Sequence, residues 1–248
     1  MKKKKLYSRE EFRDHLKFSA EKMHNNKPLQ KKAMEVLVEA DKNNWIHQVE
    51  WFGEPILNLT NDMFAIQEII FKTKPDYVVE TGIAWGGSLL FYASLLKLLG
   101  GKKVIGVDIF IPPDLVKRIR KHKVSENIEL IKGGSTDENT INKIKNLTKG
   151  SKKVLVILDS DHTHQHVLRE LEAYSNFVGK NQYLICCDTI VEIMPEQKHR
   201  PRAWGKGNNP MTALNEFLSK NKNFSIDYSF DRKLLFSCNP KGYLLCNK

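Results

Sequence analysis

The stretch from Asp76 to Leu99 constrains the fold more than any other part of this 248-residue chain. It begins with the apolar, β-prone run Tyr77–Val79, which has the pattern of a strand buried on both faces. Glu80 ends the run, the glycine-rich segment 81–88 follows, and apolar residues with helical spacing then continue to Leu99. A strand, a glycine-rich turn and a helix in this order predict an open α/β sheet that meets a nucleotide-like ligand at the turn.

The spacing within this turn indicates which nucleotide-like ligand to expect. A dinucleotide fingerprint needs glycines at positions 82, 84 and 87, but position 84 is alanine. The pattern is instead E-x-G-x-x-x-G, a spacing typical of S-adenosylmethionine (SAM) sites. The carboxylate of Glu80 suits the positive ammonium and sulfonium groups of SAM, whereas it would repel a pyrophosphate. We therefore predict that Glu80, Gly82, Gly86 and Ser88 bind SAM, because the glycines let the backbone approach and the helix start at Ser88 offers free N–H groups. The alternative is a turn that only joins a strand to a helix.

Further strands and helices alternate along the rest of the chain. Buried strands are predicted at 103–108, 128–131, 153–159 and 182–188, with helical periodicity between them. This alternation predicts right-handed crossovers and a mostly parallel sheet. Short antiparallel strands are expected at 224–228, 233–237 and 243–246. Asp108 ends the second strand, where a carboxylate can bind a ribose, and the turn with Gly134 and Ser135 ends the third, where an adenine can be held.

The segment before the central stretch is expected to be mainly helical. Helices are predicted at Arg9–Met23 and Leu29–Ala40, and a packed loop at Trp51–Asn58. An amphipathic helix is expected from Asp62, and its apolar face is predicted to comprise Phe64, Ile66, Ile69, Ile70 and Phe71. Met1–Lys5 resembles the charged start of a signal peptide, but no apolar segment follows it.

Composition narrows the class of protein. Hydrophobic residues make up 41% and charged residues 28%, which is typical of a soluble globular protein, and no apolar run approaches the ~20 residues of a membrane span. The four cysteines have neither zinc spacing nor a disulfide framework, which predicts a reducing cytoplasm. The net charge of +11 leaves open an acidic partner such as nucleic acid, anionic lipid or a phosphorylated substrate. The scattered lysines, without interleaved aromatic residues, favour a solvated basic surface over specific nucleic-acid binding.

Two aspartates and a histidine follow the predicted fourth and fifth strands. Asp159 and Asp188 end strands that are neighbours in the usual strand order, so their carboxylates are expected to converge. Two hard oxygen ligands with room for water suit Mg²⁺, and such an ion would lower the pKa of an acceptor hydroxyl. His162 is predicted to remove the hydroxyl proton. The alternatives are helix capping for each aspartate and a bystander role for His162, since His164 and His166 lie close by in the sequence.

The polar segment Pro195–Asn209 is too long for an ordinary connection, which predicts a functional loop. Its glycines suggest that it closes over the acceptor. Trp204 is its single large aromatic residue and is expected either to pack on the acceptor or only to anchor the loop.

Five motifs resemble the cephalosporin hydroxylase/rhamnosyl O-methyltransferase family. They are W-F-G-E-P-I-L (51–57), E-T-G-I-A-W-G-G-S (80–88), I-L-D-S-D-H-T-H (157–164), R-A-W-G-K-G-N-N-P (202–210) and N-P-K-G-Y-L (239–244). The resemblance runs from about Asn44 to Leu245. It implies an α/β, Rossmann-like class I SAM-dependent methyltransferase fold, with a mostly parallel seven-stranded sheet and an antiparallel C-terminal strand. Residues 1–60 would form a helical N-terminal extension and substrate-side loop, and residues 61–248 the SAM-dependent methyltransferase domain.

The resemblance also implies an activity: SAM-dependent O-methyl transfer to a hydroxyl of a sugar or similar polyhydroxyl small molecule, with SAM and Mg²⁺ as cofactors. Related enzymes bind magnesium through an aspartate after strand four and a Glu-Asp pair after strand five, and use a histidine three residues beyond the first aspartate as base. The matching positions are Asp159, Cys187-Asp188 and His162. Cys187 replaces the glutamate, and because a thiol is a poor Mg²⁺ ligand the implied site is weaker. No iron-binding triad is evident, so hydroxylase chemistry is not carried over.

Two alternative functions stay open from the sequence. The basic charge motivates an RNA methyltransferase, although the Asn/Asp-Pro-Pro-aromatic signature of amino-group methylation is absent after Asp159. Cys187 motivates a SAM-binding protein without catalytic activity. Family members are often homo-oligomers, but neither the oligomeric state nor the identity of the acceptor follows from this sequence.

Overall fold

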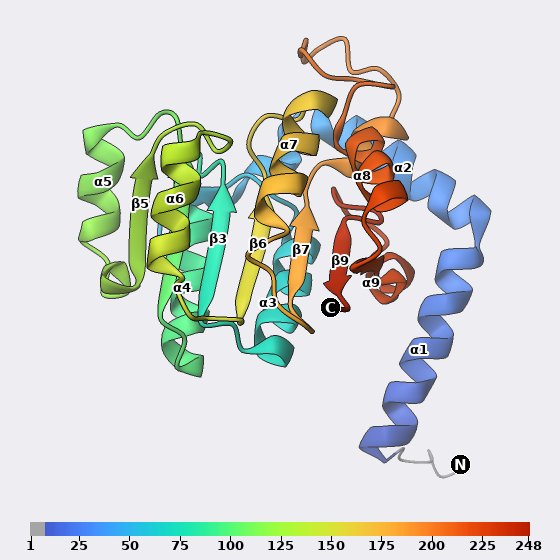
Figure 1. Ribbon diagram of the computed structural model, residues 1–248. Helices are drawn as coiled ribbons and strands as arrows, with labels where there is room; N and C mark the ends of the chain where they lie inside the picture. The colour runs from blue at the N-terminus through green and yellow to red at the C-terminus, as the bar shows by residue number, and fades with distance from the viewer. Residues whose placement is uncertain (1–7) are drawn as a thin grey trace.

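The computed structural model describes residues 8–248, and a seven-stranded sheet lies at its centre (Figure 1). The strand order is β5-β4-β3-β6-β7-β9-β8. The strands are β3 (Tyr77–Thr81), β4 (Lys103–Asp108), β5 (Ile128–Lys132), β6 (Val154–Leu158), β7 (Tyr183–Cys186), β8 (Phe224–Ile226) and β9 (Tyr243–Cys246). Strands β3 to β7 pair in parallel, whereas β9 pairs antiparallel with both β7 and β8. The mostly parallel seven-stranded sheet with an antiparallel C-terminal strand is thereby confirmed.

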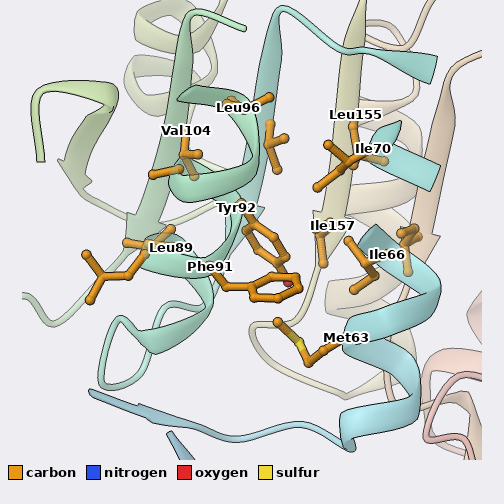
Figure 2. Close-up of a cluster of buried hydrophobic side chains, with 14 of the residues drawn as sticks. Met63, Ile66, Ile70, Leu89, Phe91, Tyr92, Leu96, Val104, Leu155 and Ile157 are labelled. Atoms are coloured by element: carbon orange, nitrogen blue, oxygen red, sulfur yellow. The ribbon is translucent and has the colours of Figure 1, made fainter. Parts of the chain in front are cut away.

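Helices cover both faces of this sheet (Figure 1). One face packs against α3 (Thr60–Thr73), α4 (Gly87–Leu99) and α5 (Pro113–Arg120), and the other against α6 (Glu138–Leu147), α7 (His164–Tyr174) and α8 (Pro210–Lys220). Figure 2 shows Ile66 and Ile70 of α3 facing Leu155 and Ile157 of β6, with Tyr92 of α4 beside them. Burial of the central strands on both faces explains their continuous apolar runs.

The N-terminal part is helical, as predicted, and comprises α1 (Arg9–Asn25) and α2 (Lys27–Asp41). Ser8 caps α1 by accepting a hydrogen bond from the N–H of Glu11, whose carboxylate accepts one from the N–H of Ser8. Helix α1 lies along α9 (Tyr228–Lys233) and extends away from the sheet (Figure 1). Helix α2 packs on the body through Leu37, which joins a cluster with Leu59, Ile190 and Cys238. Met1–Lys5 lies outside the described residues.

Two predictions about local structure are wrong. Instead of a packed loop, residues 49–56 form an antiparallel hairpin of β1 (Val49–Trp51) and β2 (Glu54–Ile56). Phe52 and Gly53 both adopt positive φ in its turn, a conformation that glycine favours and that closes tight hairpins. The strand expected at 233–237 is absent; α9 ends at Lys233 after Asp227 caps it through the N–H of Ser229, and an irregular segment follows. The remaining short elements are the 3₁₀ turns η1 (Trp45–His47), η2 (Ser125–Asn127) and η3 (Thr189–Glu192).

The apolar face predicted for α3 is partly wrong. The helix buries Met63, Ile66 and Ile70, which are spaced at helical intervals, whereas Phe64 is 62% exposed and Phe71 is 59% exposed. The two phenylalanines are seven residues apart and therefore share the opposite face. Hydrophobicity alone grouped them with the core.

Two further features concern the helices and the cysteines of the described residues. None of the helices within residues 8–248 combines the length and the apolarity that a bilayer crossing needs. The four cysteines are buried and free.

Candidate active site

A cavity of about 530 Å³ opens at the carboxyl ends of the central parallel strands. Its size is that of a small-molecule site. Among the predicted site residues, it is lined by Gly82, Asp108, Gly134, Ser135, Asp159, His162 and Asp188. The lining also includes Ile46, His47, Leu57, Ala84, Ser160, Asp161, His166, Arg200 and Trp204. The structure thus brings most of the predicted site residues into one cavity.

Strand register explains why residues so far apart in sequence meet here. Thr81 of β3 pairs with Leu158 of β6, which in turn pairs with Cys186 of β7. The three strands therefore end side by side at the same edge of the sheet. Gly82 follows β3 and Asp159 follows β6 directly at this edge, and Asp188 comes two residues after the end of β7. This is the edge at which open α/β sheets bind ligands.

Gly82 is required by close packing between strands. Its φ is +76°, and a Cβ at this position would lie 2.1 Å from the carbonyl oxygen of Asp159. Gly82 is therefore needed where the backbones following β3 and β6 approach each other. We had expected a glycine here because a ligand needs the space. Gly82 does line the cavity, but the close approach of the two backbones already requires it.

Asp108 is held in place by two backbone donors. Its Oδ2 accepts a hydrogen bond from the N–H of Ile83 (3.0 Å), and its Oδ1 accepts one from the N–H of Phe110 (2.9 Å). Each carboxylate oxygen keeps a lone pair for a ligand donor. A fixed carboxylate at the end of the second parallel strand is suited to a ribose diol.

The turn containing Gly134 and Ser135 is tied to the next strand end by a polar network. The Ser135 and Ser160 hydroxyls each lie 3.0 Å from Nε2 of His166. The Ser160 hydroxyl also donates to Glu170 (2.7 Å), whose proximity raises the pKa of His166. His166 was expected only to crowd the helix start, but it links two of the turns that line the cavity.

Three residues predicted to bind SAM do not line the cavity. Glu80 is only 2% exposed and accepts a hydrogen bond from the Ser88 hydroxyl (2.8 Å). Burial raises the pKa of Glu80 to about 8, so its carboxyl is mainly protonated at neutral pH and the negative charge assumed from the sequence is largely lost. A Cβ at Gly86 would lie 2.9 Å from the Ile119 side chain, which identifies Gly86 as a packing position. A role for these residues in SAM binding stays a prediction.

On the other side of the cavity, His162 lies between two carboxylates. Its Nε2 is 3.4 Å from Oδ2 of Asp188 and 4.0 Å from Oδ1 of Asp159. Burial and the nearby charge of Asp188 raise the pKa of Asp159 well above its usual value. The Trp204 ring packs edge-on against the imidazole, with ring centroids 5.0 Å apart. The expected convergence of the two aspartates beside His162 is therefore present in the structure.

Asp188 is held in an uncommon backbone conformation by the C-terminal motif. Its φ is +55°, a left-handed conformation that aspartate tolerates better than most residues. Its N–H donates to the side-chain oxygen of the buried Asn239 (3.0 Å), and Thr189 next to it donates to the carbonyl of Pro240 (2.6 Å). The N-P-K-G motif thus fixes the direction in which the chain leaves β7.

The side chains around Asp159 and Asp188 determine whether this part of the cavity could hold a divalent cation. Cys187 is 1% exposed and does not line the cavity, and Asp161 accepts a hydrogen bond from the N–H of Thr163 (2.7 Å). Within residues 8–248 no group of three or more His, Cys, Asp or Glu side chains is arranged as a metal site. Two adjacent carboxylates with water and substrate oxygens still suit Mg²⁺, which is commonly held by one or two carboxylates. The residues present fit a two-carboxylate site at Asp159 and Asp188.

The loop around residues 195–209 is anchored to the N-terminal helices by Asp41. The buried Asp41 carboxylate accepts hydrogen bonds from Gln197 (2.6 Å) and Arg200 (2.8 Å) and lies 3.0 Å from His199 Nε2. Arg200 and Trp204 reach the cavity from this loop, and His47 reaches it from the segment after α2. Sequence reasoning missed Arg200, His47 and the Asp41 contact because no spacing rule connects residues that lie so far apart along the chain.

Comparison with known proteins shows that this chain is similar in sequence to methyltransferases. A family model described as Rhamnosyl O-methyltransferase/CmcI matches residues 43–246. A rhamnosyl O-methyltransferase of Mycobacterium leprae (strain TN) is 31% identical over 203 residues, covering 79% of this chain and 82% of that protein. Its counterpart in Mycobacterium tuberculosis (strain ATCC 25618 / H37Rv) is 29% identical over 195 residues, covering 75% and 74%.

Solved structures show the same fold at lower sequence identity. A CmcI structure named for its Mg and SAM has a TM-score of 0.56 and 20% identity, covering 81% of this chain and 77% of that one. An SAH-bound methyltransferase of Podospora anserina, PaMTH1, has a TM-score of 0.50 and 16% identity, covering 90% and 92%. At these identities the similarity shows the fold alone.

Proposed function

The chain belongs to the Rhamnosyl O-methyltransferase/CmcI family, and we propose that it is a SAM-dependent O-methyltransferase acting on a hydroxyl of a sugar or similar polyhydroxyl small molecule. One observation carries the proposal: a single cavity joins a ribose-type carboxylate, Asp108, to an imidazole held between Asp159 and Asp188. The named activity of the mycobacterial relatives and the CmcI structure named for Mg and SAM support the same assignment.

The cofactor is assigned to the side of the cavity formed by β3, β4 and β5. Asp108 would accept hydrogen bonds from the ribose hydroxyls of SAM, and the turn at Gly134 and Ser135 would hold the adenine. Glu80 and Ser88 would act from behind the cavity by fixing the start of α4. When bound, SAM supplies an electrophilic methyl group.

The acceptor is assigned to the side formed by His162, Asp159 and Asp188. His162 removes the proton of the acceptor hydroxyl at its Nε2, and the flanking carboxylates stabilise the imidazolium that forms. The Trp204 edge limits rotation of the imidazole and excludes water from that side. Holding the acceptor oxygen and the methyl group in line supplies much of the rate enhancement.

Asp159 and Asp188 would hold Mg²⁺. When bound, the ion would orient acceptor oxygens and lower the pKa of the hydroxyl to be methylated. The raised pKa of Asp159 supports this assignment, because a cation would relieve the repulsion between the two carboxylates. Position 187 is a cysteine, so this chain offers one carboxylate fewer than the relatives with a Glu-Asp pair, and the thiol does not line the cavity.

The proposal also covers the setting and organisation of the chain. Four buried, free cysteines support a reducing, cytoplasmic environment. The proposal includes a division into an N-terminal extension (1–60) and a methyltransferase domain (61–248), and it includes no specific nucleic-acid partner.

The test is methyl transfer in an extract of the source cells with isotope-labelled SAM, followed by mass analysis of the labelled product. We expect a labelled sugar-containing small molecule, produced by the wild-type enzyme and lost with His162→Ala. Label in the nucleic-acid fraction would favour the RNA methyltransferase alternative. SAM binding by calorimetry without labelled product would favour a SAM-binding protein without catalytic activity.

A further inference from the structure

A second cavity, of about 770 Å³, adjoins the active-site cavity and is formed by residues 191–206. Arg200 and Trp204 line both cavities, so the two share a wall. Four basic side chains line the second cavity: Lys198, Arg200, Arg202 and Lys206. Glu196 is the one carboxylate among its lining residues. The second cavity is therefore strongly positive, in contrast to the carboxylates beside His162.

The Arg202 guanidinium makes no direct contact with an anionic group among the described residues. None of residues 8–248 forms an ion pair with its guanidinium or accepts a hydrogen bond from it, although the side chain is half-buried. Burial and the neighbouring charge of Arg200 lower the pKa of Arg202 and outweigh the opposing effect of Asp188 and Asp41, which line a small pocket together with it. A partly buried guanidinium without a direct ion pair is costly, because these charges offset its desolvation only in part. This position is suited to an anion supplied by a ligand.

The charges in this wall leave a net excess of positive charge. Asp41 pairs with Arg200, Glu196 offsets one further cation, and Asp188 acts on Arg202 from the neighbouring cavity, so one to two of the four positive charges remain. A phosphate ester carries about two negative charges at neutral pH. The guanidinium of Arg202 matches the geometry of phosphate oxygens through paired N–H donors. The volume of the cavity leaves room for a group esterified to that phosphate.

Trp204 places this positive cavity within reach of the reacting hydroxyl. The guanidinium carbon of Arg202 lies 6.0 Å from the Trp204 ring centre, and the His162 ring lies 5.0 Å from it. A ligand that spans the indole would therefore present one end to Arg202 and the other to His162.

We propose that the acceptor is a phosphorylated sugar, with the phosphate or diphosphate bound by Arg202, Lys198 and Lys206 in the second cavity while its hydroxyl faces His162. This inference rests on the proposed methyltransferase function and specifies its substrate class. The net charge of +11 supplies a favourable long-range field for such an anion.

The first test measures anion binding without the natural acceptor. Inorganic pyrophosphate is titrated by calorimetry at low salt and in EDTA, so that no metal bridges it to the aspartates. We expect binding that weakens at least tenfold in Arg202→Gln and about threefold in Lys198→Gln or Lys206→Gln. Lys145→Gln, at an exposed position on α6, is the charge-matched control and should bind as the parent does.

Three binding results would overturn the proposal: no pyrophosphate binding by the wild-type protein, unchanged affinity in the folded Arg202→Gln variant, or an equal loss in Lys145→Gln. Thermal melts establish that each variant is folded. Lys198→Gln and Lys206→Gln change exposed side chains, so they keep the test valid if Arg202→Gln fails to fold.

The second test examines the labelled product of methyl transfer. We expect this product to carry a phosphate that a phosphatase removes, and pyrophosphate to inhibit the reaction competitively with the acceptor but not with SAM. A labelled sugar without phosphate would overturn this inference and leave the methyltransferase function intact. Pyrophosphate binding by a protein that does not bind SAM would overturn the methyltransferase function, and with it the assignment of this cavity to an acceptor.

Discussion

The two sides of the active-site cavity are built in different ways. On the side of β3, β4 and β5, backbone groups and glycines shape the wall, and the Asp108 carboxylate is fixed by two N–H donors from its own and the preceding turn. On the side of β6 and β7, charged and aromatic side chains dominate, and several come from a loop anchored by Asp41 of α2. The proposed cofactor therefore lies against a wall set mainly by the backbone, and the proposed acceptor against a wall set mainly by side chains.

The largest effect is expected from breaking the backbone contact between the two sides. Gly82→Val should prevent stable folding, because its Cβ would overlap the carbonyl of Asp159 and its φ is positive. We expect loss of the cooperative melting transition together with loss of SAM binding. Gly53→Val is the matched control: its φ is also positive, but no atom lies within 4 Å of the added Cβ, so it should cost only about 1–3 kcal/mol. Similar melting curves for the two variants would contradict the packing argument.

On the acceptor side, His162→Ala should slow methyl transfer by roughly 10²–10⁴-fold without much change in SAM affinity, because it removes the proton acceptor. His164→Ala is a suitable control, since His164 contacts Thr212 and Glu216 and does not line the cavity. Single-turnover rates and SAM calorimetry separate the two effects. A rate for His162→Ala equal to that of the control would exclude His162 as the base. Full wild-type activity in EDTA would exclude a metal but leave this assignment of His162 standing.

On the cofactor side, Glu80 should make stability depend on pH. Its pKa is raised from 4.5 to about 8 in the folded state, so the folded protein binds its proton more tightly than the unfolded chain does. The resulting stabilisation is full below about pH 4.5 and is lost as pH rises to about 8, a change on the order of 5 kcal/mol. Glu80→Gln keeps an acceptor for Ser88 and should flatten this decline. The measurement is the free energy of unfolding of both proteins at several pH values. Parallel pH profiles would show that Glu80 is not the titrating group.

The smallest effect is expected from the aromatic wall. Trp204→Ala should raise the acceptor KM about tenfold and leave SAM affinity nearly unchanged, since the indole contacts His162 and lines both cavities. Trp85→Ala tests the other side: this tryptophan is 54% exposed and does not line the cavity, so neither constant should change. An unchanged acceptor KM with a lowered Tm for Trp204→Ala would identify Trp204 as a structural anchor of the loop.

The order and apolarity of the segments were enough to predict the sheet and the edge of the sheet at which the site lies. The apolar runs at Tyr77–Val79 and 153–159 can be buried on both faces only in a central parallel sheet, because covering helices are needed on each side. Parallel strands end at a common edge, so Asp108, Asp159 and Asp188 could be assigned to that edge from their positions alone. His162 followed from its spacing after Asp159.

Which of these side chains reach the cavity depends on how distant elements pack together. Side chains alternate between the faces of a strand, so a residue one step from the strand end, such as Glu80, is directed into the packing beneath α4 and loses its charge there. The contact of Asp41 with Arg200 joins residues more than 150 positions apart in the sequence. The position of Arg202 beside Trp204 depends on the path of one loop. Local periodicity carries no information about such contacts, because their stability comes from desolvation and charge compensation in the assembled fold.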